Sequence, residues 1–182
     1  MLVLGLGNPG ARFESTRHNV GFDVVATYSQ THNVPLRKKL FRPLRWSGCT
    51  SPVLAQPLTY MNRSGVVVPW LLEHCGLSFD KFLVVTDNLD LPAGKIRLKR
   101  GGKNRSHKGI ASVIAFTGRT DFLRLYVGIG RPGPDNTVVE HVLERPAGEE
   151  AELIGDAIKR AVEAVDLLSI SSVESVMNEV NR

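Results

Sequence analysis

Cysteine is scarce in this 182-residue chain, which contains only Cys49 and Cys75. Neither belongs to a C-x-x-C motif or a Cys/His cluster, so the sequence predicts neither a disulfide framework nor a structural zinc site. His74 adjoins Cys75, but neighbouring residues on a helix point apart and no third ligand is nearby. We therefore expect two buried, free thiols.

Long apolar runs are also missing from the chain. No stretch approaches the roughly 20 apolar residues of a membrane span, and the apolar start at 1–6 is too short and lacks the basic leader of a secretory signal. Internal repeats, long linkers and low-complexity tracts are absent, and the length suits one domain. These absences predict a soluble, cytoplasmic, single-domain protein (1–182) with no membrane partner, and we expect a monomer.

Acidic residues are few in the first three quarters of the chain. Residues 1–139 carry 19 Lys and Arg against 8 Asp and Glu, whereas residues 140–182 carry 4 against 10. This asymmetry favours contact between a polyanion and the first part of the chain, which is typical of a nucleic-acid binder.

Short apolar runs alternate with helical periodicity along the chain. The sequence predicts strands at 1–6, 52–56, 83–86, 95–99 and 124–129. It predicts helices around 22–28 and 67–75, a helix capped by Ser106, and an amphipathic helix at 149–168. The apolar stripe of this last helix comprises Leu153, Ile154, Ala157, Ile158, Ala161, Val162 and Val165. The pattern predicts an α/β fold: a single-domain three-layer sandwich with a mixed, mostly parallel sheet flanked by helices.

The run Gly5-Leu6-Gly7-Asn8-Pro9-Gly10 has the G-x-G-x-x-G spacing of a dinucleotide-binding loop. In such a site a helix begins at the third glycine, whereas here Asn8-Pro9-Gly10 has turn chemistry and periodicity resumes only near Val20. A nicotinamide-dependent oxidoreductase is thus the weaker hypothesis. The turn can instead hold the Asn8 amide at a sheet edge for a ligand, or Asn8 can bond its own turn.

His18 precedes a predicted helix in a segment with little core character, which makes it a candidate general base. Asp87 follows the buried strand 83–86, whose end would deliver its carboxylate to the same sheet edge, and Asp90 comes three residues later. Alternatively, either aspartate closes the turn by bonding its own backbone.

Two further segments have binding chemistry. Tyr60 and Asn62 stand at another strand-to-helix junction, where the ring can be a stacking surface or core and the amide a ligand contact or a helix cap. Residues 95–108 contain glycines and no acid, and they suit a phosphate-binding loop or a solvated basic hairpin. The basic residues are Lys95, Arg97, Lys99, Arg100, Lys103, Arg105 and Lys108.

Five ordered motifs extend over nearly the whole chain: Gly5–Gly10, Thr16–Asn19, Tyr60–Gly65, Asp87 with Leu89–Pro92, and Val127–Gly130. Together they resemble the motifs of the bacterial-type peptidyl-tRNA hydrolases. The resemblance implies hydrolysis of the ester that joins a peptide to the 3′ ribose of tRNA, with peptidyl-tRNA as partner and no metal or cofactor.

Site roles follow from the same resemblance. His18 matches the general base that activates water, and Asp87 matches the aspartate that orients it. Asn8 matches the asparagine that helps to distinguish peptidyl-tRNA from aminoacyl-tRNA. Tyr60 and Asn62 match positions that hold the peptide and the terminal nucleotide.

The chain departs from the family pattern at its substrate-binding positions. Phe13 replaces a usual tyrosine, which keeps the packing but removes a hydroxyl group. Lys108 replaces an asparagine, so a substrate contact or a positioned water is changed. Lys99 matches a basic residue that grips the tRNA 5′ phosphate, but the usual arginine partner aligns with Tyr126. The remaining tRNA-binding candidates are in the same basic segment: Lys103, Arg105 and His107. These changes keep open a second hypothesis, a catalytically weak or inactive RNA-binding relative.

Overall fold

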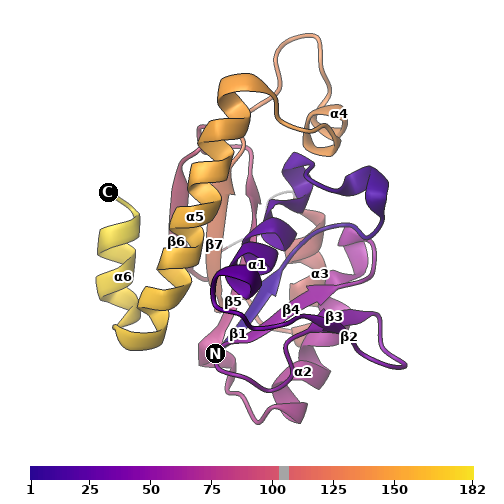
Figure 1. Ribbon diagram of the computed structural model, residues 1–182, viewed down its shortest axis with the longest axis vertical. Helices are drawn as coiled ribbons and strands as arrows, with labels where there is room; N and C mark the ends of the chain where they lie inside the picture. The colour runs from indigo at the N-terminus through magenta and orange to yellow at the C-terminus, as the bar shows by residue number, and fades with distance from the viewer. Residues whose placement is uncertain (103–106) are drawn as a thin grey trace.

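The framework is a seven-stranded sheet, seen in a computed structural model that describes residues 1–102 and 107–182 (Figure 1). The strand order is β2-β3-β4-β1-β5-β7-β6. Strands β4, β1, β5 and β7 run parallel, whereas the β2–β3, β3–β4 and β6–β7 pairs are antiparallel. The strands are β1 (Leu2–Gly5), β2 (Arg37–Lys38), β3 (Leu44–Trp46), β4 (Val53–Pro57), β5 (Phe82–Asn88), β6 (Ile96–Arg100) and β7 (Leu123–Gly128).

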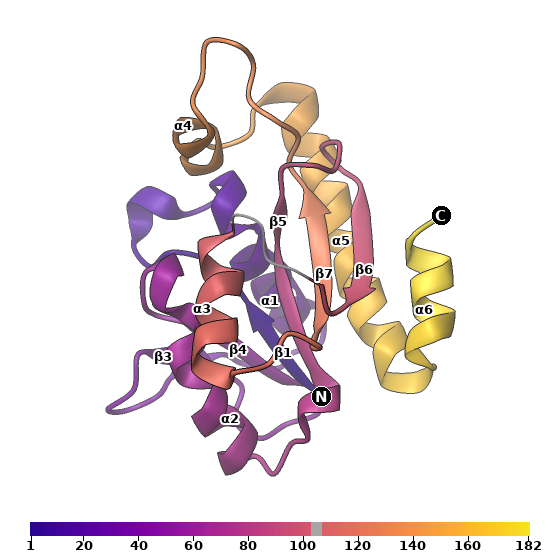
Figure 2. The same cartoon turned by 180° about the vertical axis from the view of Figure 1, so that it is seen from behind.

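Helices cover both faces of this sheet (Figures 1 and 2). Helices α1, α5 and α6 lie on one face, and 3-10 helix η3 with α2 and α3 lies on the other, which confirms the predicted three-layer α/β sandwich. Their bounds are α1 (Val20–Thr31), η3 (Met61–Val67), α2 (Val68–His74), α3 (Lys108–Thr117), α5 (Gly148–Ile170) and α6 (Val173–Val180). Shorter helices are η1 (Ala11–Phe13), η2 (Arg17–Asn19), η4 (Phe79–Lys81) and α4 (Val138–Leu143). Among the described residues, no helix combines the length and apolarity needed to cross a bilayer.

The central strands are buried on both faces because their successive side chains alternate between the two helical layers. Val3 and Val85 pack toward α1 and α5, whereas Leu4 and Val84 pack toward α2 and α3. All four side chains are at most 1% exposed. The short continuous apolar runs of the sequence therefore correspond to central strands, as predicted.

Two glycines allow α1 to lie directly against the sheet. A Cβ on Gly5 would lie 2.1 Å from the carbonyl oxygen of Gly21, and a Cβ on Gly21 would lie 2.4 Å from that of Val85. Gly10 has a φ of 108°, which suits the turn predicted there. Helix α1 begins at Val20, so no α-helix starts directly after Gly10. The glycines of this run therefore contribute to packing and to the geometry of the turn.

The prediction of two free thiols is wrong, because Cys49 and Cys75 form a disulfide with their Cα atoms 5.3 Å apart. Cys49 is exposed and Cys75 is only partly buried. The bond joins the loop after β3 to the end of α2. These segments are 26 residues apart in sequence but are in contact in the fold. The spacing of two lone cysteines in the sequence does not predict that contact.

Two details of the predicted helices also differ from the structure. Leu153, assigned to the buried stripe of α5, is 43% exposed because it lies at the flank of the helix beside Gly94. The N-cap of α3 is His107, whose side chain accepts hydrogen bonds from the amides of Gly109 and Ile110. The predicted cap, Ser106, lies outside the described residues.

The C-terminal helix α6, which the sequence did not indicate, covers the edge strand β6. The Asn181 side chain accepts a hydrogen bond from the Leu98 amide at 2.8 Å and donates one to the Leu98 carbonyl at 2.9 Å. A side-chain amide thus provides the pairing that an eighth strand would provide, and the edge is partly closed to other strands.

Asp23, in the first turn of α1, should make stability depend on pH. Burial, with a contribution from Glu14, raises the pKa of Asp23 to about 6. The native state therefore binds a proton more readily than the unfolded state, and this group's contribution to stability falls as pH rises from about 4 to about 6. We expect Asp23→Asn to raise the free energy of unfolding by about 2 kcal/mol at pH 7 and by far less at pH 4.

Urea denaturation of wild type and Asp23→Asn at pH 4, 5, 6 and 7 measures this difference. Subtracting the two proteins at each pH removes the titration of other groups. An equal difference at pH 4 and pH 7 would contradict a raised pKa for Asp23.

Candidate active site

A cleft with a volume of about 1120 Å³ lies at the carboxyl edge of the parallel strands. Its walls come from the turn after β1, from η1, η2 and η3, from the loop after β5, and from α3 and α4. Strand ends of a parallel sheet are where α/β folds place ligands, because loops there converge on one crevice.

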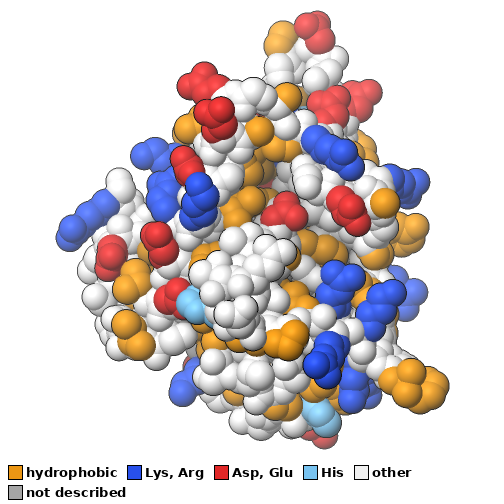
Figure 3. Space-filling model, viewed as in Figure 1, with side chains coloured by type: hydrophobic (Ala, Val, Ile, Leu, Met, Phe, Trp, Pro, Cys, Tyr) orange, Lys and Arg blue, Asp and Glu red, His pale blue; other side chains and the backbone are white. Residues whose placement is uncertain are grey.

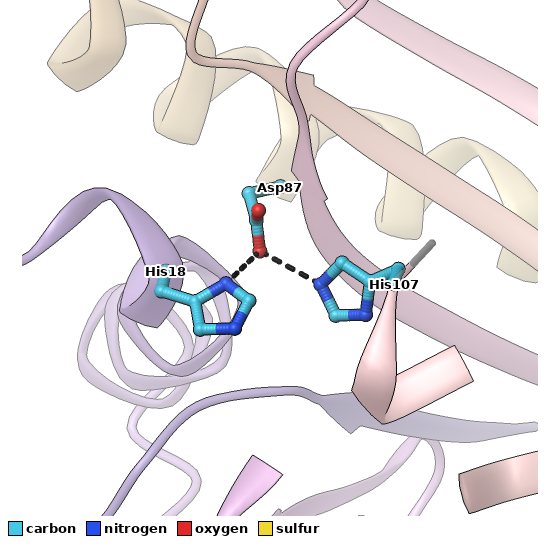
Figure 4. A group of neighbouring side chains, drawn as sticks. All are labelled: His18, Asp87 and His107. Carbon is cyan, nitrogen blue, oxygen red and sulfur yellow. Dashed lines mark hydrogen bonds and ion pairs between the residues drawn. The ribbon is translucent and has the colours of Figure 1, made fainter. Parts of the chain in front are cut away.

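The deepest polar group in this cleft is Asp87, near the end of β5, which is 3% exposed. Its Oδ1 lies 2.9 Å from Nδ1 of His18 and 3.0 Å from Nε2 of His107 (Figure 4). The structure thus brings His18 and Asp87 into direct contact from positions 69 residues apart.

His107 has a defined tautomer because both ring nitrogens are constrained. Its Nδ1 accepts hydrogen bonds from the amides of Gly109 at 3.1 Å and Ile110 at 3.3 Å. An accepting nitrogen has no proton, so Nε2–H is the donor toward Asp87. Thr86 Oγ1 also lies 2.8 Å from this Nε2. The sequence placed His107 among the substrate- and tRNA-binding residues. In the structure it lines the cleft, and its ring is held against the Asp87 carboxylate.

Asp87 is an anion in this setting. Burial by itself would raise the pKa of its carboxyl group, but the nearby imidazoles of His107 and His18 more than offset burial and hold that pKa well below its usual value. An ionised Asp87 requires His18 Nδ1 to be the protonated nitrogen that donates to it. In the neutral ring the lone pair of His18 Nε2 is then available, and no described residue forms a hydrogen bond with that atom.

The segment around His18 is anchored by its neighbour Arg17, for which the sequence gave no role. Arg17 donates from Nε and Nη2 to the two carboxylate oxygens of Glu150 on α5, at 2.8 and 2.6 Å, and from Nη1 to the carbonyl of His141 on α4. A bidentate pair fixes direction as well as distance. Arg17 therefore ties η2, and with it His18, to two helices.

Asn8 is held by three hydrogen bonds. Its amide donates to Asn19 Oδ1 at 2.8 Å, its carbonyl accepts from Asn19 Nδ2 at 2.9 Å, and its Oδ1 accepts from the Met61 amide at 2.8 Å. Since Met61 N–H must meet an acceptor, Nδ2 of Asn8 is the group left to donate into the cleft. The alternative of a turn asparagine that bonds only its own loop is wrong.

Comparison of the sequence with known proteins identifies the family to which this site belongs. The sequence model described as peptidyl-tRNA hydrolase matches residues 2–182. The chain belongs to the peptidyl-tRNA hydrolase family. Among its relatives, the peptidyl-tRNA hydrolase of Halalkalibacterium halodurans is 42% identical over 183 residues, which cover 99% of both chains. The peptidyl-tRNA hydrolase of Dehalococcoides mccartyi is 42% identical over 186 residues, covering 99% of this chain and 98% of the relative.

Solved structures agree with the sequence comparison. The crystal structure of the peptidyl-tRNA hydrolase from Acinetobacter baumannii superposes with a TM-score of 0.88 at 33% identity. The match covers 99% of this chain and 93% of that one. The mixed sheet and its helical layers are therefore those of a peptidyl-tRNA hydrolase.

The remaining predicted residues that the structure describes line the cleft around the His–Asp–His cluster. Phe13 and the half-exposed Tyr60 meet edge to face with ring centres 6.4 Å apart, which provides an apolar wall. The other predicted residues lining the cleft are Asn62, Lys99, Lys108 and Tyr126. Lys103 and Arg105 lie outside the described residues.

His18, Asp87 and His107 are also the group of described side chains that could hold a metal ion, since their ligand atoms lie within 4.8 Å of one another. The nitrogens that face Asp87 already bond its Oδ1, and Nδ1 of His107 caps α3. A metal ion would have to replace these hydrogen bonds. The donor set therefore suits a hydrogen-bonded His–Asp–His cluster better than a metal centre.

Proposed function

We propose that this chain hydrolyses the ester bond between a peptide and the 3′ ribose of tRNA, with His18 as the general base. The observation that supports the proposal is the 2.9 Å contact between His18 Nδ1 and the ionised Asp87, which leaves Nε2 of His18 to accept a proton in the cleft. Membership of the peptidyl-tRNA hydrolase family supplies the substrate class.

The reaction would proceed through water activation. His18 Nε2 takes a proton from a water molecule as the water oxygen bonds to the ester carbonyl carbon. The ester C–O bond then breaks, and the 3′ oxygen of the ribose takes the proton from Nε2. Asp87 faces the imidazolium during both steps and stabilises its positive charge.

Asn8 would recognise the peptide rather than take part in proton transfer. Its Oδ1 is occupied by the Met61 amide, so its Nδ2 can donate to a carbonyl oxygen of the bound substrate. A free aminoacyl-tRNA has only the ester carbonyl, whereas a peptidyl-tRNA adds a peptide carbonyl at the next position. One fixed donor in the cleft can therefore contribute to the distinction.

Deacylation of N-acetyl-aminoacyl-tRNA, compared with free aminoacyl-tRNA, tests the proposal. Release of the blocked amino acid alone is the expected result. A protein that binds tRNA with steep salt dependence but never deacylates it would instead support the alternative of an RNA-binding relative.

Lys108 should contribute to RNA binding rather than to chemistry. It is the first residue of α3, it is exposed, and it lines the cleft without an ion-pair partner among the described residues. We expect Lys108→Asn to raise KM about 3- to 5-fold, to change kcat little, and to reduce the salt dependence of binding by about one phosphate contact. Steady-state kinetics at several salt concentrations measure all three. A lower KM in Lys108→Asn would mean that the lysine hinders the substrate.

A further inference from the structure

The β2–β3 hairpin has an unbalanced positive charge. Between Asp23 and Glu73 the sequence contains no acidic residue. The hairpin contributes five of the cations in this interval: Arg37, Lys38, Lys39, Arg42 and Arg45. None of them belongs to an ion pair within residues 1–102 and 107–182. Their charge is therefore available to an anionic partner.

The cations on the two faces of the hairpin have different neighbours. Lys38 and Arg45 are directly opposite each other on the paired strands, and both are exposed. Like charges in this position repel, and an anion between them would remove that repulsion. On the other face, Arg42 lies 4.3 Å from the ring centre of Trp70, and Lys39 lies 5.4 Å from that of Trp46. Aromatic rings thus hold part of the charge in place.

The hairpin tip is apolar and exposed. Phe41 is 95% exposed and the adjacent Leu40 is 72% exposed. Lysines on an edge strand can have a purely protective role, in which they prevent that strand from pairing with other molecules. That role does not account for a protruding aromatic ring. Cations combined with an exposed ring are typical of nucleic-acid surfaces, where bases stack and phosphates pair with the charges.

The tip lies at the same edge of the sheet as the cleft. Leu58 donates its amide to the Pro43 carbonyl at 2.7 Å, and Leu58 is two residues before Tyr60 on the cleft wall. In Figure 3, Lys and Arg side chains gather over the hairpin at the lower right, beside a protruding hydrophobic side chain. The basic hairpin therefore lies next to the cleft wall that contains Tyr60.

We propose that the β2–β3 hairpin binds the sugar-phosphate backbone of the RNA whose 3′ end occupies the cleft, with Phe41 as a stacking surface. This inference rests on the proposed function, because it takes tRNA as the molecule in the cleft. The hairpin adds affinity for the body of the RNA and takes no part in ester cleavage. An anionic membrane is the other surface that suits a basic hairpin with an apolar tip, but the hairpin's contact with the cleft wall favours RNA.

Two variants separate the charge of the hairpin from its ring. The double variant Lys38→Gln, Arg45→Gln removes two exposed cations, and Phe41→Asn removes the ring with a residue that tolerates the φ of 60° found there. Binding of unacylated, full-length tRNA is measured across salt concentrations. We expect the double variant to bind about 5-fold more weakly at 0.1 M salt, with a log–log salt slope smaller by about 1 to 2. We expect Phe41→Asn to weaken binding about 3-fold or more with an unchanged slope.

The matched control is Lys81→Gln, Lys159→Gln, which removes the same charge from η4 and from α5, away from the cleft. A control that changes the slope as much as the hairpin variant would overturn the proposal, as would a hairpin variant with unchanged tRNA binding. Loss of binding to vesicles containing phosphatidylserine, with tRNA binding intact, would assign the hairpin to a membrane. Self-association of the hairpin variant with unchanged tRNA binding would leave edge protection as its role.

Hydrolysis of an N-acetyl-aminoacyl ester of the trinucleotide CCA keeps this test separate from the proposed function. The fragment is too short to reach beyond the cleft, so all hairpin variants should cleave it at the wild-type rate. If wild type does not cleave it, the proposed function fails, whereas the salt slopes with unacylated tRNA still decide the role of the hairpin.

Discussion

Replacing His18 with alanine is expected to lower the single-turnover rate of N-acetyl-aminoacyl-tRNA hydrolysis by about 10³-fold. The variant loses the only cleft nitrogen that Asp87 orients with its lone pair left to accept a proton, within the described residues. Binding of tRNA should change little, since the imidazole contributes to the reaction and not to charge pairing with phosphates. Rates measured with enzyme in excess report the chemical step separately from product release.

His32→Ala is the matched control for this variant. His32 is also paired with an aspartate, Asp166, but on the surface between α1 and α5 and away from the cleft. Wild-type rates in His32→Ala and a large loss in His18→Ala would support His18 as the base. Equal rates in His18→Ala and wild type would exclude it from that role.

The second large effect is expected in Asp87→Asn, whose hydrolysis rate should fall by about 10²- to 10⁴-fold. The amide has no charge to stabilise the imidazolium of His18. If its NH₂ group turns toward His18, the ring must accept at Nδ1 and place its proton on Nε2, where a base needs a lone pair. The fold should be retained, because a buried charge is removed and the size of the side chain is kept.

Asp80→Asn provides the comparison for this variant, because Asp80 is an exposed aspartate on η4 at the opposite edge of the sheet. Thermal unfolding of both variants tests the fold, and single-turnover kinetics test the chemistry. A rate within a factor of two of wild type in Asp87→Asn would show that an ionised carboxylate is not needed there.

The sequence predicted the elements that depend on local pattern. Central strands such as 83–86 are short apolar runs, and the helix at 149–168 has an apolar stripe of the correct period. The turn at Asn8-Pro9-Gly10 follows from residues whose backbone preferences are strong. In each case the information lies within a few consecutive residues.

Features that depend on contacts between segments distant in sequence could not be predicted from the sequence. The bond between Cys49 and Cys75, the contact of Asn8 with Met61 and the pairing of Asn181 with Leu98 join residues 26 to 83 positions apart. His107 illustrates the same limit within the site. Its sequence neighbours are basic and suggested RNA. Its place as helix cap and donor to Asp87 depends on the contact between the start of α3 and the end of β5.

The neutral His107 also determines how the total charge of the buried cluster changes during the reaction. With Asp87 ionised and His18 neutral, as the proposed mechanism requires, the three side chains together would have a net charge of −1. In the proposed mechanism, transfer of a proton from water to His18 would bring that total to zero. In that mechanism the buried carboxylate is in place before the imidazolium forms, so the electrostatic field of the site would favour the transition state over the resting enzyme.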